Sequence, residues 1–313
     1  MMDLMGLKKQ FSSDIEAIND TMTKALHACD IPDLVAIYDY VQQKKGKQVR
    51  SLMVMLVGSL VSHPPHQSLY YLGACVDLIH LASLIHDDII DDASDRRSQA
   101  SLYKRFGLNK SLIVGIHCYS LALKLGVKTN SLSVVQCLSD AVKYLCEGEF
   151  KQMNERYNIQ LPIPEYWDIV HKKTSSLFVA ALEASAILCE VSPIIRQKIA
   201  MFGRIFGDIF QLTDDYLDMY GTHDTLSKKV KQDLVTGDIS LAMILAGQFE
   251  SVQTMDDLSG VLTRRGHDIQ THIKAELTKK DRQGHDYLDA IQAEGHDVTH
   301  LRTLLRILTN RIN

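Results

Sequence analysis

The sequence predicts an all-α fold, a bundle of about ten or more helices that surrounds a central apolar cavity. Apolar residues recur at helical spacing along most of the chain, and no segment shows the alternation of a half-buried strand. The 313 residues include one Trp, 17 Gly and 6 Pro, and this composition favours helices over strands. Because 46% of the residues are hydrophobic and no linker divides the chain, we expect one large core in a single domain over residues 1–313.

Prolines and glycines mark the expected helix ends. Residues 1–30 form one predicted amphipathic helix that ends at Ile31-Pro32, and a basic loop at 44–50 precedes an apolar helix at 52–61. Further helices are expected at 68–92, 112–126, 131–157, 165–190 and 194–220. A polar, lysine-rich loop is expected at 223–237, and the remainder should form shorter helices separated at Gly260, Gly266, Gly284 and Gly295.

Charge, leader and cysteine content exclude several classes of protein. The net charge of −4 gives no reason to expect nucleic-acid binding. Residues 1–10 lack the apolar segment of a signal peptide, and no run approaches the ~18 apolar residues that a membrane span needs. We therefore expect a soluble, cytoplasmic protein that can still act on a lipid. The scattered cysteines are expected to be reduced core residues, not a disulfide framework or a zinc site: Cys29, Cys75, Cys118, Cys137, Cys146 and Cys189.

The most informative stretch places four carboxylates in six residues, Asp87, Asp88, Asp91 and Asp92. Aspartates three and four residues apart share a helix face, where each like-charged pair costs about 0.2–0.5 kcal/mol. A hard cation would offset this cost, since Mg²⁺ takes oxygen ligands from carboxylates and from substrate phosphates. Arg96 and Arg97 follow, and guanidinium groups suit phosphate oxygens. Taken alone, such a cluster is better explained by a solvated helix face or by capping acids.

A second acidic cluster repeats this spacing more than a hundred residues later, as Asp214-Asp215-x-x-Asp218, again within an apolar segment. Two such helices that face each other would form a cleft with carboxylate walls at one end of an apolar bundle. A solvated helix face does not readily explain two acidic clusters with the same spacing in apolar segments. The sequence therefore predicts a magnesium site to which both helices contribute.

Three Gly-His-Asp triplets begin at Gly266, Gly284 and Gly295. His-Asp pairs can be metal ligands, as in metal-dependent phosphohydrolases. Each triplet stands in a polar stretch at a glycine that is expected to stop a helix, so helix capping is the preferred interpretation.

From these residues the chain resembles the all-trans isoprenyl diphosphate synthases (trans-polyprenyl transferases). The resemblance runs in order from about Lys47 to Leu241, and it includes both aspartate motifs and the pair Arg96-Arg97. Gly46-Lys47-x-x-Arg50 is similar to the family's isopentenyl diphosphate loop. Shorter matches are His80, Gly148-Glu149, Lys173-Thr174, Phe210-Gln211 and Lys228. The resemblance implies the isoprenoid synthase fold and the condensation of an allylic diphosphate, such as farnesyl or geranyl diphosphate, with isopentenyl diphosphate.

The resemblance also implies a role for each matched residue. Mg²⁺ ions that bridge to the allylic diphosphate would be held by Asp87, Asp91 and Asp214, and Asp88, Asp215 and Asp218 would complete the metal shells directly or through water. The allylic diphosphate would be bound by Arg96, Lys173 and Lys228, and the isopentenyl diphosphate by Lys47, Arg50, His80 and Arg97. The expected catalytic residues are Lys173, Thr174 and Gln211, the last two by presenting oxygen dipoles to a carbocation. The structural alternatives are a core histidine at His80, a surface lysine at Lys173 and a core threonine at Thr174.

Product length is expected to depend on the residues one helical turn before Asp87. These are Ala82 and Ser83, both small, where short-chain members of the family place an aromatic ring as a floor. A growing chain could therefore continue into the bundle along Val76 and Ile79. We expect a long all-trans product, C30 or above, of the kind used for quinone side chains.

The chain departs from the family pattern at several positions near the expected site. Unusual residues are Gln48, Ser51, Asp77, Tyr103, His117 and Asp238. Gln48 and Asp238 stand where an arginine and a lysine are common, so the loss of two cations could weaken binding of both diphosphates.

Two other functions fit parts of the sequence. One is a non-catalytic or regulatory subunit that binds a prenyl chain within a heteromeric synthase, although the intact acids argue against it. The other is a class I terpene cyclase, whose second metal site normally mixes Asn, Ser or Thr with Glu, unlike Asp214-Asp215-x-x-Asp218. By the resemblance we expect Mg²⁺ as cofactor, a homodimer with a heterodimer as the alternative, and at most peripheral membrane contact for product release.

Overall fold

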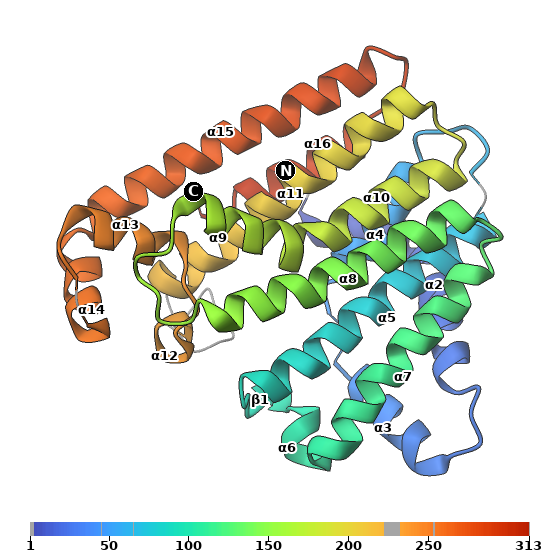
Figure 1. Cartoon of the computed structure of the whole chain (residues 1–313). Helices are drawn as coiled ribbons and strands as arrows, with labels where there is room; N and C mark the ends of the chain where they lie inside the picture. The colour runs from blue at the N-terminus through green and yellow to red at the C-terminus, as the bar shows by residue number, and fades with distance from the viewer. Residues whose placement is uncertain (1–2, 45, 65, 222–231, 253, 313) are drawn as a thin grey trace.

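The computed structural model describes residues 3–44, 46–64, 66–221, 232–252 and 254–312. These residues form helices α1 to α16, one π-helical turn and one hairpin of two strands with two residues each (Figure 1). The predicted all-α bundle is thereby confirmed. Lys228 and most of the expected loop at 223–237 lie outside the described residues.

The N-terminal segment forms two helices and not the single helix that the sequence predicts. Asp3 accepts a hydrogen bond from the backbone N of Gly6 at 2.7 Å and begins α1 (Leu4–Gln10). The chain bends at Phe11 (φ −109°, ψ 24°), and α2 continues over Ser12–Leu26. Pro32 then begins α3 (Pro32–Gln42), which the sequence interpretation did not include; proline suits this position because the first helical N–H needs no partner. The apolar helix predicted at 52–61 is α4 (Val49–Gly58).

Helix α5 (His66–Ile90) lies at the centre of this half of the bundle. It packs on α2, α4, α7 (Leu108–Val127) and α10 (Ser176–Leu188), and most of its apolar side chains are buried. After α5, strands β1 (Asp95–Arg96) and β2 (Gln99–Ala100) pair antiparallel, with Arg96 opposite Gln99. Arg97 and Ser98, both with positive φ, form the turn of this hairpin, so Arg96 and Arg97 are held close to the end of α5. Helix α6 (Leu102–Phe106) leads into α7.

The second half of the bundle carries the second acidic motif. Helix α8 (Leu132–Asn154) packs on α10 (Ser176–Leu188) and on the π-helical turn η1 (His171–Ser175) that joins α9 (Ile163–Val170) to α10. The helix predicted at 165–190 is therefore continuous but contains a π-helical turn. Helix α11 (Pro193–Tyr220) begins at a proline, as predicted, and Ser192 is its N-cap. It lies against α10 and α15 (Gly266–Gln292) (Figure 1).

The C-terminal region contains α12 (Gln232–Thr236), α13 (Leu241–Phe249), α14 (Met255–Arg264), α15 (Gly266–Gln292) and α16 (Thr299–Thr309). The expectation that four glycines separate these helices is wrong at two of them, because Gly260 lies within α14 and Gly284 within α15. A Cβ at Gly284 would lie 3.0 Å from Leu305 Cδ2, so this glycine serves the close packing of α15 on α16. Capping accordingly does not explain the Gly284 triplet, whereas Gly266 and Gly295 do stand at helix ends.

Two helices in the described part of the chain, α5 and α7, are long and apolar enough to cross a membrane, which differs from the sequence expectation. In the most apolar 18-residue stretch of each helix, 56% is buried in α5 and 44% in α7. Helix α5 is a core helix of the bundle. The structure pairs none of the six cysteines. Cys75 and Cys118 are buried, as predicted, but Cys146 is exposed.

Candidate active site

A cavity of about 700 Å³ lies where α4, α5, α8, η1 and α11 meet. Asp87 from α5 and Asp214 from α11 both line it, so the two acidic motifs share one cavity as predicted. The other predicted site residues on its wall are Lys47, Arg50, His80, Arg96, Arg97, Lys173, Thr174 and Gln211. Leu81, Leu84, Leu145 and Phe150 are among the apolar residues that complete the wall. Such a mixture of apolar wall and few convergent charges is typical of a small-molecule site.

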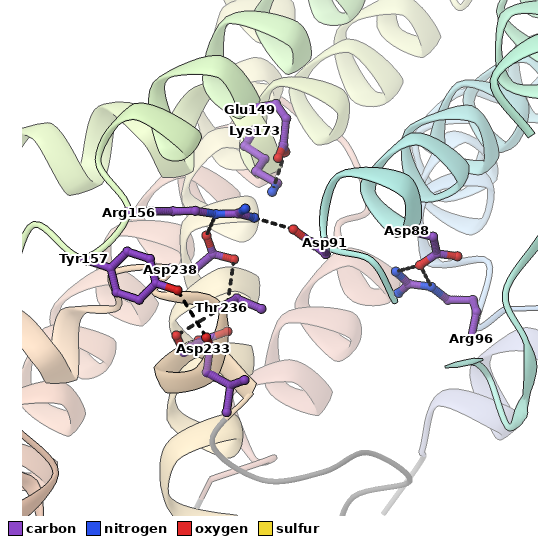
Figure 2. Close-up of polar contacts among 11 residues, drawn as sticks. Asp88, Asp91, Arg96, Glu149, Arg156, Tyr157, Lys173, Asp233, Thr236 and Asp238 are labelled. Carbon is purple, nitrogen blue, oxygen red and sulfur yellow. Dashed lines mark hydrogen bonds and ion pairs between the residues drawn. The ribbon is translucent and has the colours of Figure 1, made fainter. Parts of the chain in front are cut away.

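The acids of the first motif point in three directions. Asp87 faces the cavity, and its pKa is raised to about 7 by burial and by the nearby charges of Glu149 and Asp91. Asp88 is 3% exposed and pairs with Arg96. Asp91 pairs with Arg156, which Figure 2 shows beside Asp238. Of these acids, only Asp87 lines the shared cavity in the described structure.

The second motif is similarly divided. Asp214 lies on the shared cavity and contacts Arg311 Nη1 at 2.7 Å. Asp215 accepts hydrogen bonds from Tyr166 Oη at 2.8 Å and from Gln211 Nε2 at 2.7 Å. Burial raises the pKa of Asp215 to about 7. Asp215 lines a smaller adjacent cavity that shares the wall residues Lys173, Thr174 and Gln211 with the large one.

The donor set fits a hard divalent cation. The two acidic motifs offer carboxylate oxygens, and Asp87 lies beside other acids, where a cation would lower the electrostatic cost. Among the described residues, no three His, Cys, Asp or Glu side chains converge closely enough to hold a metal by themselves. Mg²⁺ suits such an open arrangement, because it usually binds one or two carboxylates together with substrate phosphates and water.

The basic residues on the cavity wall suit an anion. Arg50 is buried against the ring of Phe178, with Cζ 4.3 Å from the ring centroid, and burial lowers its pKa to about 10. Its Nε has no hydrogen-bond partner among the described residues, so a buried donor remains available for an anion. Arg97 Nη1 donates to Lys44 O at 3.0 Å. A Cβ at Gly46 would lie 2.8 Å from Arg97 Cζ, so this glycine permits the close approach.

His80 is half-buried among these cations. Burial and the charges of Arg50 and Arg97 hold the pKa of His80 well below its usual value, which keeps the imidazole neutral. A neutral imidazole adds no repulsion beside the two arginines and can still donate one hydrogen bond.

Lys173 and Thr174 are placed by the π-helical turn η1. Lys173 Nζ lies 2.5 Å from Glu149 Oε2, and Thr174 donates to Gln211 Oε1 at 2.5 Å. A Cβ at Gly148 would lie 2.5 Å from the backbone N of Lys173, so Gly148 lets α8 approach this turn. π-Helical turns are frequent at functional sites because they redirect side chains within an otherwise regular helix.

A buried carboxylate below this turn was missed by sequence reasoning. Asp208, 1% exposed, accepts hydrogen bonds from Ser175 Oγ at 2.8 Å and Lys280 Nζ at 2.8 Å, and pairs with His171 at 3.2 Å. Burial alone would raise its pKa, but the hydrogen bond from His171 and the charge of Lys280 lower it. Lys280 comes from α15, more than seventy residues away, and no motif in the sequence connects it to Asp208.

Several residues that depart from the family pattern make polar contacts with other side chains. Gln48 Nε2 and Ser51 Oγ donate to Asp77 Oδ2 at 3.3 and 2.8 Å, so three of the unusual residues form one cluster beside the cavity. Asp238 accepts from Arg156 Nε at 2.9 Å. His117 contacts the hydroxyl of Tyr38.

The expectation that Ala82 and Ser83 both point into the cavity is confirmed only for Ser83. Ser83 lines the cavity, but Ala82 is fully buried in the core and does not. Val76 and Ile79 are also core residues away from the cavity wall. The reason is the helix periodicity: Ser83 lies four residues before Asp87, on the same face of α5, whereas Ala82 faces the neighbouring helices.

Carboxylates from two helices, several cations and apolar side chains line one cavity, and this combination suits a metal ion and a diphosphate with an apolar tail. The profile of the polyprenyl synthetase family matches residues 31–277, and the chain belongs to this family. The predicted family and the predicted enzyme class, a prenyltransferase of the polyprenyl diphosphate synthase type, are thereby confirmed.

Similar proteins agree with this assignment. Octaprenyl diphosphate synthase of Haemophilus influenzae is 29% identical over 253 residues, which cover 81% of this chain and 76% of the relative. Heptaprenyl diphosphate synthase component 2 of Geobacillus stearothermophilus is 26% identical and covers 80% of this chain and 78% of its own. A polyprenyl synthase from Caulobacter crescentus, solved with calcium and isoprenyl diphosphate, is 26% identical with a TM-score of 0.81, over 99% of this chain and 97% of that one. A decaprenyl diphosphate synthase from Rhodobacter capsulatus, 21% identical, shows the same fold with a TM-score of 0.86 over 99% and 98% of the two chains.

Proposed function

We propose that this protein condenses an allylic diphosphate with isopentenyl diphosphate, in the presence of Mg²⁺, to make a long all-trans polyprenyl diphosphate. The observation that carries the proposal is that Asp87 and Asp214 line one cavity together with Arg50 and Lys173. The octaprenyl relatives and the small Ser83 on the cavity wall support a product of C30 or above. Farnesyl or geranyl diphosphate is the expected primer.

The reaction breaks the allylic C–O bond and forms a C–C bond to the double bond of isopentenyl diphosphate. Bound Mg²⁺ would stabilise the negative charge of the departing diphosphate. The metal ligands would be Asp87 and Asp214 on the cavity together with Asp91, and Asp88, Asp215 and Asp218 would complete the shells directly or through water. Lys173 and Arg96, with Lys228 from outside the described residues, would bind that same diphosphate and contribute most in the transition state.

The second substrate would be held on the opposite wall. Lys47, Arg50 and Arg97 supply positive charge there, and His80 supplies a neutral hydrogen-bond donor. Thr174 and Gln211, hydrogen-bonded to each other, would present oxygen dipoles to the carbocation. The released pyrophosphate would take the final proton, so no side chain needs to act as a base.

A homodimer is supported by an exposed apolar face on α7. Its exposed residues are Leu108, Leu112, Ile113, Ile116, Leu123 and Val127, which is unusual for a surface that stays in water. We infer that this face is covered by a second copy. Ile116→Asp should then shift the protein to a monomer in size-exclusion chromatography.

A heteromeric synthase is the second candidate, because two relatives are component 2 of heptaprenyl diphosphate synthases. The terpene cyclase alternative is not supported by any of the similar proteins described above. We also propose that residues 1–313 act as a single domain in the cytoplasm, with peripheral membrane contact for product release.

The decisive assay uses the purified protein with Mg²⁺, farnesyl diphosphate and labelled isopentenyl diphosphate. Turnover by the protein alone, abolished by EDTA, supports the proposal. No turnover alone, but turnover after a second protein from the same cell is added, would favour the heteromeric subunit.

A further inference from the structure

Arg156 lies in the turn after α8 and joins the first aspartate motif to the segment that follows α12. Its Nη2 contacts Asp91 Oδ1, and its Nε donates to Asp238 Oδ1 at 2.9 Å (Figure 2). All three side chains are largely buried, with 21%, 26% and 15% exposed for Arg156, Asp91 and Asp238. One guanidinium is therefore shared between an acid of the proposed metal site and an acid outside both motifs.

Of the two acids that Arg156 contacts, Asp238 lies in the segment that is attached more firmly to the turn after α8. The backbone N of Tyr157 donates to Gly237 O at 2.8 Å, and Thr236 Oγ1 donates to Asp238 Oδ2 at 3.1 Å. Gly237, at φ 78°, lies so close to the ring of Tyr157 that a Cβ there would be 2.5 Å from it. The turn after α8 is thus docked on residues 235–238, and Arg156 can stay on Asp238 when its contact with Asp91 is lost.

We propose that Arg156 is a built-in counter-ion of Asp91 that a divalent cation displaces, and that Asp238 retains the released guanidinium beside the metal site, where it binds diphosphate. The proposal rests on the proposed function, because it requires Asp91 to be a metal ligand. A carboxylate oxygen in contact with a guanidinium is poorly available to a metal ion, since two cations would meet at one atom. A guanidinium freed from one carboxylate offers N–H donors that match phosphate oxygens in pairs.

The same segment also reaches the second motif. Asp218 Oδ2 accepts a hydrogen bond from the backbone N of Asp233 at 3.1 Å, at the start of α12. Asp91 of the first motif is therefore linked to residues 232–238 through Arg156, and Asp218 of the second motif contacts them directly. Residues 232–238 thus border both motifs. Release of Arg156 from Asp91 would remove the link between these residues and the first motif.

If Arg156 is a displaceable counter-ion of Asp91, its variants should differ in metal affinity from those of a purely structural bridge. Arg156→Gln removes the competitor and should tighten metal binding, whereas Asp238→Asn leaves Arg156 to Asp91 alone and should weaken it. A bridge that only fastens the turn predicts lower stability for both variants and metal affinity shifted in the same direction or not at all.

The double variant separates direct competition from long-range charge. If Asp238 acts only by holding part of Arg156, then Asp238→Asn should have no effect on metal affinity in the Arg156→Gln background. If both residues act merely through their charge, Asp238→Asn should weaken metal binding equally in both backgrounds.

The experiment titrates Mn²⁺ alone into each purified protein and measures free Mn²⁺ by electron paramagnetic resonance. We expect about fivefold tighter binding for Arg156→Gln and about fivefold weaker binding for Asp238→Asn. Arg156→Lys keeps the charge but loses the paired N–H donors of the guanidinium. Its Mn²⁺ affinity should lie between those of wild type and Arg156→Gln, and it replaces the glutamine variant if that variant does not fold. Tyr157→Phe, in the same turn and without charge, is the matched control and should bind Mn²⁺ as wild type does.

Inorganic pyrophosphate in saturating Mg²⁺ provides the second readout. Arg156→Gln should bind pyrophosphate several-fold more weakly although it binds the metal more tightly, and equal or tighter pyrophosphate binding overturns the proposal. Shifts of the same sign for both single variants, or an unchanged Asp238→Asn effect in the double variant, also overturn it. If wild type itself binds neither Mn²⁺ nor Mg²⁺-pyrophosphate, the proposed function fails instead.

Discussion

Lys280 Nζ of α15 lies 2.8 Å from Asp208 Oδ2 of α11, and the same carboxylate accepts a hydrogen bond from Ser175 in the π-helical turn. Lys280 also lies 3.8 Å from the ring centroid of Trp167. The contact joins the C-terminal part of the bundle to the turn that places Lys173 and Thr174 on the cavity. Asp208 and Lys280 are therefore positioning residues that lie outside the cavity wall.

Asp208→Asn should lower both stability and the use of the allylic substrate. The variant leaves Lys280 buried without its anion, which costs about 3 kcal/mol of unfolding free energy. Because η1 loses an anchor, KM for the allylic diphosphate should rise more than KM for isopentenyl diphosphate. Urea unfolding and steady-state kinetics check this; Lys279→Met, at the exposed neighbouring lysine, should change neither. Unaltered kinetics in Asp208→Asn would show that η1 holds its shape without this anchor.

Thr174→Val should remove the hydroxyl that donates to Gln211 without changing the side-chain shape. We expect kcat to fall about tenfold, which corresponds to ~1.4 kcal/mol of transition-state stabilisation, with metal affinity unchanged. Thr213→Val is the control, since Thr213 is a buried threonine whose hydroxyl donates only to Ile209 O in its own helix, at 2.5 Å. Equal losses in both variants would assign the effect to packing.

Metal binding should become more favourable as pH rises through about 7. The folded-state pKa of Asp87 is raised to about 7 by burial, so its contribution to stability is present at low pH and lost as pH rises from about 4 to 7. Bound Mg²⁺ removes this loss, and the melting temperature should therefore gain more from Mg²⁺ at pH 8 than at pH 6. Asp87→Asn should reduce that difference but not abolish it, because the pKa of Asp215 is also about 7. A Mg²⁺ effect independent of pH would contradict this account.

Product length should respond at Ser83 more than at Ala82. Ser83→Phe places a ring on the cavity wall and should shorten the product by at least one five-carbon unit, as measured by mass spectrometry of the dephosphorylated alcohols. Ala82→Phe overpacks a fully buried position and should destabilise the fold by about 1–3 kcal/mol instead. The same short product from both variants, without loss of stability, would mean that the tail follows another path.

Much of the fold could be predicted because its signals are local. Pro193 begins α11 and apolar spacing defines α5, both of which depend on backbone restriction and helix periodicity alone. The glycines were a weaker guide: Gly284 looks like a helix stop, but its function is to admit Leu305 from another helix. A glycine that permits close packing cannot be told from a glycine that ends a helix unless the neighbour is known.

The candidate site was predictable where residue type and spacing determine the chemistry. Asp87, Asp214 and the cations Lys47 and Arg50 were identified from the sequence, and the structure places them on one cavity. Their partners were not, because Arg156, Arg311 and Lys280 reach the acids through tertiary contacts that leave no pattern along the chain. For the same reason the sequence presented Gln48 and Asp238 as lost cations, whereas the structure gives each a new partner.

The central claim, that the two aspartate motifs build one metal-diphosphate site, is tested most directly by a double-mutant cycle on Asp87 and Asp214. The measurement is Mg²⁺-dependent binding of inorganic pyrophosphate by titration calorimetry to wild type, Asp87→Asn, Asp214→Asn and the double variant. A shared site predicts that each single variant loses most of the affinity and that the double variant loses little more. Independent, additive losses, or wild-type binding in either single variant, would contradict the account.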